Sequence, residues 1–321
     1  MNWQTANATA MLRAPQVHRD LGVDRTGYVD VFAALRAAGV DCLTRRMPKL
    51  FGFYFAPEDN GPAVLLNASL DEIGLRHTAA HELGHHVFDH GSRADTDLDI
   101  AGLQPQRSWT VVEKQAESFA AWFLMPPPAV DAALRRIGIE QVQQPEHAYE
   151  VARWLGTYYA GTVRHLHRLH KIDAKAAASW PRVPPQRLRA RLHRPTLERP
   201  TSHLFVIRPS SQGGELHVAI GDLLLLPPDA RLTHLPDGLV SADTDACSPG
   251  AVLDWTAEPG GRSSLSVEVT EGFRSSSTLS FVVSGDDLIS VTVVAPVRRF
   301  GAPDAWGCAD EPDHSQPVDQ D

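Results

Sequence analysis

Two histidines and a glutamate carry the clearest chemical pattern in the chain, in the run His81-Glu82-Leu83-Gly84-His85. Residues four apart project from one face of a helix, so His81 and His85 are placed to bind one metal ion. Glu82 is placed to take a proton from the water that attacks a peptide carbonyl. The pattern therefore predicts a hydrolytic metal site with Glu82 as its catalytic base. The alternative is a core helix whose two histidines are simply hydrogen-bonded.

A second predicted helix, over residues 113–125, carries two candidate carboxylate ligands. A catalytic zinc ion takes three protein ligands and leaves one position for water. Glu113 and Glu117 share one helix face, so we expect Glu113 to be the third ligand and Glu117 to orient a ligating histidine. Spacing alone does not decide which glutamate binds the metal. Without the upstream helix, the pair also fits a solvated acidic stripe.

A third histidine ligand is not expected. The longer pattern H-E-x-x-H-x-x-G-x-x-H is broken, because Phe88 and Gly91 occupy its critical positions. We interpret His90, which follows the helix by a turn, as a hydrogen-bonded surface residue rather than a metal ligand.

The run from His77 to His86, together with residues 113–126, resembles the ImmA/IrrE metallopeptidase family. The resemblance covers about residues 30–130, and the three-part order of the chain is similar to that of the family's radiation-response regulators. Many relatives carry a glutamate and an asparagine where this chain has Gln115 and Glu117. Because Gln115 is not an anionic ligand, this departure favours Glu113 as the metal-binding carboxylate.

The resemblance implies a multidomain α+β chain. Its parts would be a gluzincin-like (zincin) metallopeptidase domain over residues 1–127, a helix-turn-helix domain with a linker over 128–195, and a GAF-like sensor domain over 196–321. It also implies a narrow protein substrate, a helix-turn-helix repressor of the XRE type, cut at one site to induce a DNA-damage response. The sequence leaves open whether zinc or manganese fills the site.

The residues themselves predict the following elements in the first part. The histidine helix spans residues 70–90, and one further helix lies over residues 29–39. Three strands are predicted over 40–44, 51–55 and 63–67, and three prolines at 126–128 end the glutamate helix.

The middle part is helical over residues 129–178 and strongly basic. Residues 153–199 hold 11 Lys and Arg against 2 Asp and Glu. Two helices over 148–172, with a break at Gly156 or Gly161, fit a helix-turn-helix whose second helix presents basic residues. That charge fits phosphate binding, docking of an acidic partner surface or a solvated face. We favour docking through Arg164 and Arg168 over DNA binding. Residues 180–200, rich in Pro and Arg, are predicted to be a linker.

The last part is predicted to be a small antiparallel sheet around a ligand pocket, with an acidic tail from Gly301 onward. Residues 200–321 hold 6 Lys and Arg against 18 Asp and Glu. No fingerprint for a nucleotide, haem or bilin is present. The predicted strands cover residues 203–207, 215–226, 263–270, 278–283 and 288–294.

Composition points to a cytoplasmic protein without a membrane partner. The chain has 321 residues, 43% of them hydrophobic, but no apolar run near the ~20 residues that cross a bilayer. The first residues do not have the pattern of a signal peptide. Three scattered cysteines, Cys42, Cys247 and Cys308, exclude a disulfide scaffold and fit a reducing compartment.

Two classes of function remain. The first is a site-specific metallopeptidase, and the second is a DNA-binding transcription regulator with a sensor domain and a structural metal site. The first is favoured, because a structural site has no use for a base at Glu82 and is normally closed by a fourth protein ligand.

Overall fold

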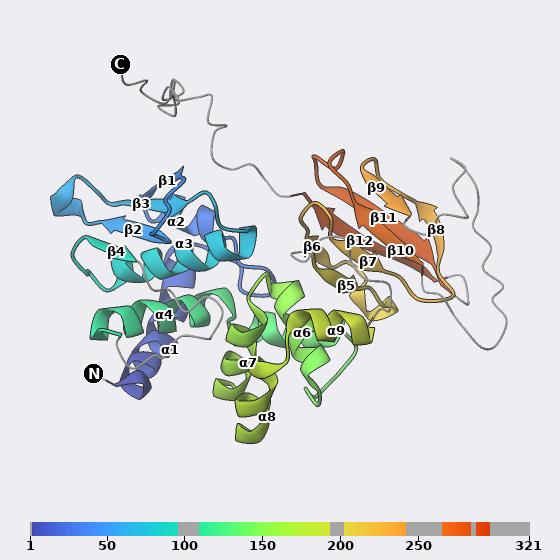
Figure 1. Cartoon of the computed structure of the whole chain (residues 1–321), viewed down its shortest axis with the longest axis horizontal. Helices are drawn as coiled ribbons and strands as arrows, with labels where there is room; N and C mark the ends of the chain where they lie inside the picture. Colours follow the sequence, from blue (N-terminus) through green and yellow to red (C-terminus); the bar gives the residue numbers. More distant parts are fainter. Residues whose placement is uncertain (1, 96–108, 193–201, 242–264, 284–286, 296–321) are drawn as a thin grey trace, which may run out of the picture.

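The computed structural model describes residues 2–95, 109–192, 202–241, 265–283 and 287–295. Helices and several small sheets occur together, which confirms the α+β class. Figure 1 shows a sheet with helices at one end of the molecule, a group of helices in the middle and strands at the other end. Each helix of the described residues is too short or too polar to cross a membrane. The acidic tail lies outside the described residues, and the domain boundaries stay a prediction.

The N-terminal part contains a four-stranded sheet in the order β1-β3-β2-β4. The first two strands in this order are parallel, and the other pairs are antiparallel. The three predicted strands are confirmed, and the edge strand β4 is an addition. The bounds are β1 (Asp41–Arg45), β2 (Gly52–Phe55), β3 (Ala63–Asn67) and β4 (Arg93–Asp95).

The histidine helix α3 (Glu72–Val87) packs against strands β2 and β3. The Asp71 side chain begins it by accepting a hydrogen bond of 2.7 Å from the Gly74 amide. The glutamate helix α4 (Val111–Leu124) packs against α3 in turn. A Cβ atom at Gly84 would lie 2.9 Å from the Ala116 Cα atom, so only glycine permits this close approach.

A long helix that the sequence reading missed, α1 (Trp3–Asp20), packs against α4. Its contact face consists of small residues at intervals of four, Ala6, Ala10 and Ala14, each fully buried. Alanines give a weak amphipathic signal, although their spacing is helical. The short helix α2 (Val31–Ala37) lies within the predicted segment 29–39, and the Asp30 side chain caps its N-terminus by accepting hydrogen bonds from the Phe32 and Ala33 amides.

The middle part is helical, and the prediction that residues 180–200 form a linker is wrong in part. Residues 185–192 form helix α9, in which Leu188 is fully buried. A basic helix with a single buried stripe shows little apolar periodicity, which explains the miss. The other helices here are α5 (Pro127–Arg136), α6 (Pro145–Leu155), α7 (Tyr159–Arg168) and α8 (Ala174–Ser179).

Helices α6 and α7 meet at Gly156, which has a φ of +58°. This selects Gly156 over Gly161 as the break, because a left-handed residue ends a helix and glycine adopts it without strain. The predicted apolar face of α6 is confirmed as buried. The second helix, α7, was expected to carry its basic residues on an exposed face, and this is wrong for His165. That side chain is fully buried and hydrogen-bonded to the Met125 carbonyl at 2.9 Å.

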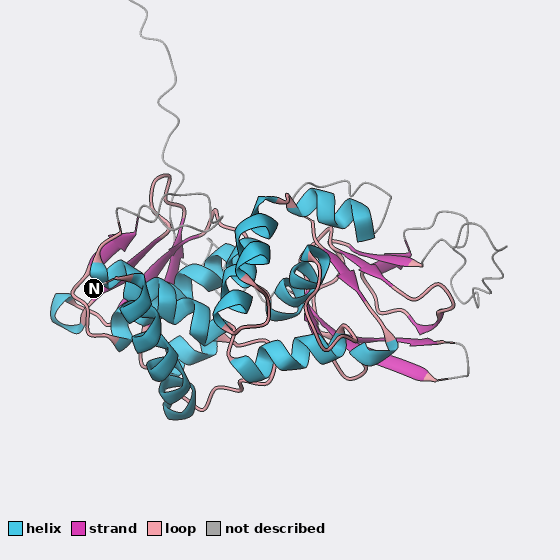
Figure 2. Cartoon of the chain, turned by 90° about the horizontal axis from the view of Figure 1, so that it is seen from below, coloured by secondary structure: helices cyan, strands magenta, loops and turns pink. Residues whose placement is uncertain are grey.

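The described residues of the C-terminal part form two four-stranded sheets, not one antiparallel sheet. Their orders are β5-β7-β10-β9 and β6-β12-β11-β8, and each contains one parallel pair, β5 with β7 and β6 with β12. Figure 2 shows them as two layers at one end of the molecule. The bounds are β5 (Leu204–Val206), β6 (Glu215–His217), β7 (Leu223–Leu225), β8 (Arg231–His234), β9 (Leu239–Ser241), β10 (Ser266–Val269), β11 (Ser277–Val282) and β12 (Leu288–Val294).

The segment 215–226, predicted as one strand, is divided between the two sheets. Gly221 has a φ of +87°, and the Asp222 side chain accepts a hydrogen bond of 2.8 Å from the Ala219 amide. This turn sends β6 and β7 into different layers. The GAF-like and helix-turn-helix assignments stay predictions.

Several contacts join the three parts. The Arg76 guanidinium of α3 lies 3.7 Å over the Tyr28 ring, and that ring stacks on His217 of β6 at 3.3 Å. Arg208, which follows β5, pairs with Glu150 of α6. A cavity of about 120 Å³ lies at this junction.

We expect Leu188→Ala to lower the free energy of unfolding by roughly 2–5 kcal/mol, the usual cost of a cavity at a buried leucine. The control Arg187→Ala, at the exposed neighbouring position, should change it by no more than about 0.5 kcal/mol. Urea denaturation measures both. Equal effects of the two substitutions would contradict the helical packing of residues 185–192.

Asp222 predicts a pH-dependent stability. Burial raises the pKa of this carboxyl to about 7, against hydrogen bonds from the Ala219 and His203 amides and the charge of Arg153. Between about pH 4 and 7 the unfolded chain loses a proton that the folded chain keeps, so this group's stabilisation declines as pH rises through that window. The free energy of unfolding should therefore fall more from pH 4.5 to 7.5 in the unaltered chain than in Asp222→Asn. If the free energy of unfolding changed equally with pH in the two chains, the raised pKa of Asp222 would be contradicted.

Candidate metal centre

Three side chains from α3 and α4 converge on one point. The Nε2 atoms of His81 and His85 lie 3.1 Å apart, and Glu113 Oε2 lies 3.1 Å from the first and 3.5 Å from the second. Both histidines are fully buried, whereas the Glu113 side chain is 19% exposed. Across the described residues, this is the one group of three that can hold a metal ion.

The remaining ring nitrogens of both histidines also have polar neighbours. Glu117 Oε2 lies 3.6 Å from His81 Nδ1 and 2.9 Å from His77 Nε2. The Nδ1 atoms of His85 and His90 lie 2.9 Å apart. His90 is therefore hydrogen-bonded, as predicted, but it is half-buried rather than on the surface, because the turn after α3 folds this ring back onto His85.

The histidines set the charge of the two glutamates. Burial acts to raise the pKa of Glu113, but hydrogen bonds from His81 and His85 and their charges outweigh it and hold the pKa far below its usual range. Burial likewise opposes ionisation of Glu117, and the charge and hydrogen bond of His77 hold its pKa well below the usual value. Both carboxyls are thus anions beside imidazoles.

Glu82 is fully buried one residue after His81. Its carboxylate lies against the first residue of β2, since a Cβ atom at Gly52 would fall 2.1 Å from Glu82 Oε1. A side chain at position 52 would therefore occupy the place of this carboxylate. The glycine that begins β2 makes room for the predicted base.

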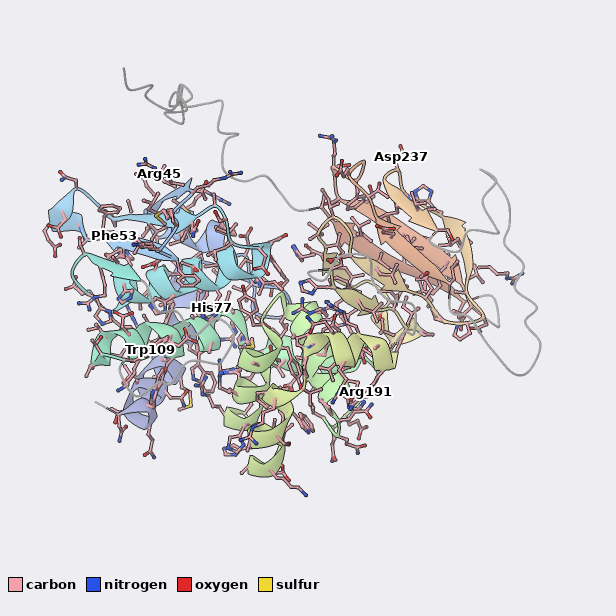
Figure 3. The ribbon with its side chains drawn as sticks, in the orientation of Figure 1. Arg45, Phe53, His77, Trp109, Arg191 and Asp237 are labelled. Carbon is pink, nitrogen blue, oxygen red and sulfur yellow. The ribbon has the colours of Figure 1, made fainter. Side chains whose placement is uncertain are left out.

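Two residues beside the metal centre were not predicted from the sequence. Arg93 of β4 places its Nη1 atom 3.4 Å from Glu113 Oε1, the oxygen that faces away from the histidines. The Trp109 ring lies 6.4 Å from that of His81. Figure 3 shows Trp109 and His77 among the helices, below the strand that carries Phe53 in this view. No local spacing links Arg93 or Trp109 to the histidine motif.

The comparison with known families agrees with this geometry. Residues 46–153 match the family model of the IrrE N-terminal-like domain, Peptidase_M78. The matched segment contains both α3 and α4. This segment is a metallopeptidase domain of the ImmA/IrrE family. The comparison with curated proteins gives no match.

The donor set of the ImmA/IrrE-type domain fits a divalent metal. Two imidazole nitrogens and one carboxylate oxygen form a ligand set that catalytic zinc takes, with a fourth position for water. The second ring nitrogens lie beside Glu117 and His90, which corresponds to the outer contacts that fix histidine ligands.

Arg164 and Arg168, which follow the matched ImmA/IrrE-type segment on helix α7, do not lie on an open surface. Both side chains are partly buried and line a crevice with His77 and Glu117. Among the other basic residues of this segment, Lys171 pairs with Asp131 at 2.8 Å. The predicted outward basic face is therefore reduced to a few exposed side chains.

We expect about one metal ion per chain by elemental analysis, and a sharp loss in His81→Ala and Glu113→Ala. Glu117→Ala should keep the ion with an affinity lowered by roughly 10–100-fold, because it removes only an outer contact. Full metal retention in Glu113→Ala, with loss in Glu117→Ala, would move the third ligand to Glu117.

Proposed function

We propose that the chain is a zinc-dependent endopeptidase that cuts one protein substrate at a specific site. The observation that carries the proposal is the convergence of His81, His85 and Glu113 in a domain of a metallopeptidase family. The buried carboxylate of Glu82 on the same helix supports hydrolysis over a purely structural site.

In this proposal, His81, His85 and Glu113 hold the ion. When bound, a divalent metal supplies the Lewis acid that polarises the scissile carbonyl and activates water. Glu82 takes the proton from the attacking water and passes it to the leaving amine. The Glu117 carboxylate, which lies 3.6 Å from His81 Nδ1, orients the His81 imidazole and raises the basicity of that ring.

The substrate that we propose is a helix-turn-helix repressor of the XRE type, whose cleavage induces a DNA-damage or radiation response in the cytoplasm. Support comes from the family resemblance of the peptidase segment. The middle helices and the C-terminal sheets would then serve selection and regulation, as the helix-turn-helix and GAF-like predictions have it.

The competing function, a DNA-binding regulator with a structural metal, gains no support from the basic helix. His165 of α7 is fully buried, and Arg164 and Arg168 are partly buried residues that line a crevice. A recognition helix needs such residues on a face that enters the DNA groove.

Glu82→Gln keeps the size of the side chain and removes the base. Hydrolysis should fall by roughly 10²–10⁴-fold, while metal content and thermal unfolding stay unchanged. The assay mixes the purified, zinc-loaded chain with candidate XRE-type repressors, with and without a chelator, and follows cleavage by mass spectrometry. An unaltered rate in Glu82→Gln would contradict the mechanism, and intact repressors in every mixture would contradict the substrate.

A further inference from the structure

The two oxygens of the Glu113 carboxylate face different partners. Oε2 lies 3.1 Å from His81 Nε2 and 3.5 Å from His85 Nε2, so it is the oxygen that faces the proposed metal position. Oε1 lies 3.4 Å from Arg93 Nη1. A carboxylate that ligates a metal through one oxygen leaves the other to accept a hydrogen bond, and such outer contacts fix the direction of the ligand. Arg93 occupies the position of such a contact.

Glu113 needs a contact of this kind more than the two histidines do. Both imidazoles are fully buried on α3, whereas the Glu113 side chain is 19% exposed and lies in the first turn of α4. Its three rotatable bonds give it many conformations that point to solvent rather than to the histidines. A partner on Oε1 restricts this freedom before the metal binds.

Strand pairing holds the backbone of Arg93 in place. β4 pairs with β2 so that Arg93 stands opposite Tyr54, a buried residue. The Tyr54 hydroxyl lies 3.0 Å from His86 Nδ1 of α3, which ties β2 to the histidine helix. Just before Arg93, the Ser92 hydroxyl accepts a hydrogen bond of 2.8 Å from the Ala56 amide. The strand that carries Arg93 is thus fixed relative to α3.

Stabilisation of the fold is the weaker explanation of the contact between Arg93 and Glu113. The Arg93 side chain is 34% exposed, and ion pairs with this access to water contribute little to the free energy of unfolding. A cation beside a metal site also repels the ion, so a guanidinium without a further role there would lower metal affinity. A role in placing Glu113 accounts for both the contact and its location.

We propose that Arg93 is a positioning residue of the metal centre, which holds Glu113 Oε1 and thereby directs Oε2 to the metal. The planar guanidinium presents its donors in a fixed fork, which suits a carboxylate better than the single ammonium of lysine does. This inference rests on the proposed peptidase function, because it names a further residue of the same metal site.

The test measures zinc binding, so that it needs no substrate. The dissociation constant of Zn²⁺ is obtained by competition with a chromophoric chelator. Arg93→Gln should weaken zinc binding by roughly 10–100-fold, the usual effect of losing an outer contact. Arg93→Lys should weaken it less, because the ammonium still carries hydrogen-bond donors. Unchanged or tighter binding in Arg93→Gln overturns the proposal, since relief of charge repulsion alone would tighten binding.

Arg45→Gln is the matched control. Arg45 is an exposed arginine at the end of β1, the opposite edge strand of the same sheet, so this substitution makes the same change in charge away from the centre. It should leave the zinc dissociation constant unchanged. Urea unfolding of the metal-free chains should give nearly the same free energy for Arg93→Gln and the unaltered chain. A loss of zinc affinity matched by an equal loss of metal-free stability would make Arg93 a structural residue and overturn the proposal.

A double-mutant cycle shows whether Arg93 acts through Glu113. In the Glu113→Ala background the carboxylate is gone, so Arg93→Gln should cause no further loss of the remaining zinc affinity. A further loss as large as that in the chain with Glu113 intact would mean that Arg93 acts by another route, and it would overturn the positioning role.

The outcome is separable from that of the proposed function. Cleavage of a repressor by the unaltered chain, with equal zinc affinity in Arg93→Gln, leaves the peptidase standing and removes the positioning role. Weaker zinc binding in Arg93→Gln, with no cleavage of any repressor, supports the positioning role and removes the proposed substrate.

Discussion

The site depends on how closely helix α3 approaches helix α4. A Cβ atom at Gly84 would lie 2.9 Å from the Ala116 Cα atom, so a larger residue would push the helices apart. At the observed separation, Glu113 Oε2 lies 3.1 Å from His81 Nε2. A shift of one ångström would take the carboxylate out of contact with both imidazoles. The glycine within the histidine motif is thus a packing requirement of the same site.

Charge reinforces this packing. Anionic Glu113 and Glu117 lie along one face of α4, and the histidines of α3 oppose them. Isolated buried carboxylates would be costly, but each has an imidazole or guanidinium neighbour, including Arg93 on the outer oxygen of Glu113. The two helices therefore carry complementary polar faces inside an apolar surrounding, and α1 closes the far side of α4 with alanines.

The N-terminal turns of α3 connect this centre to the rest of the chain. The Arg76 side chain donates hydrogen bonds to the Val29 and Leu155 carbonyls and lies over the Tyr28 ring. Through Tyr28 and His217, the C-terminal sheets contact the helix that carries the histidines.

The sequence by itself determined the histidine helix, the glutamate helix and the strand over residues 63–67, because each follows from residue spacing along a single element. It also limited the helix break in the middle part to Gly156 or Gly161. It did not show α1, whose alanines give a weak periodic signal, or the basic helix α9. Only the tertiary structure decided that Glu113 meets both Nε2 atoms and that His90 folds back onto His85. It also decided that Arg168 and Glu117 line one crevice and that β6 and β7 belong to different sheets. Local periodicity assigns a residue to a face of its own helix or strand. The partner of that face depends on the distance and angle between elements, which the packing of distant residues sets.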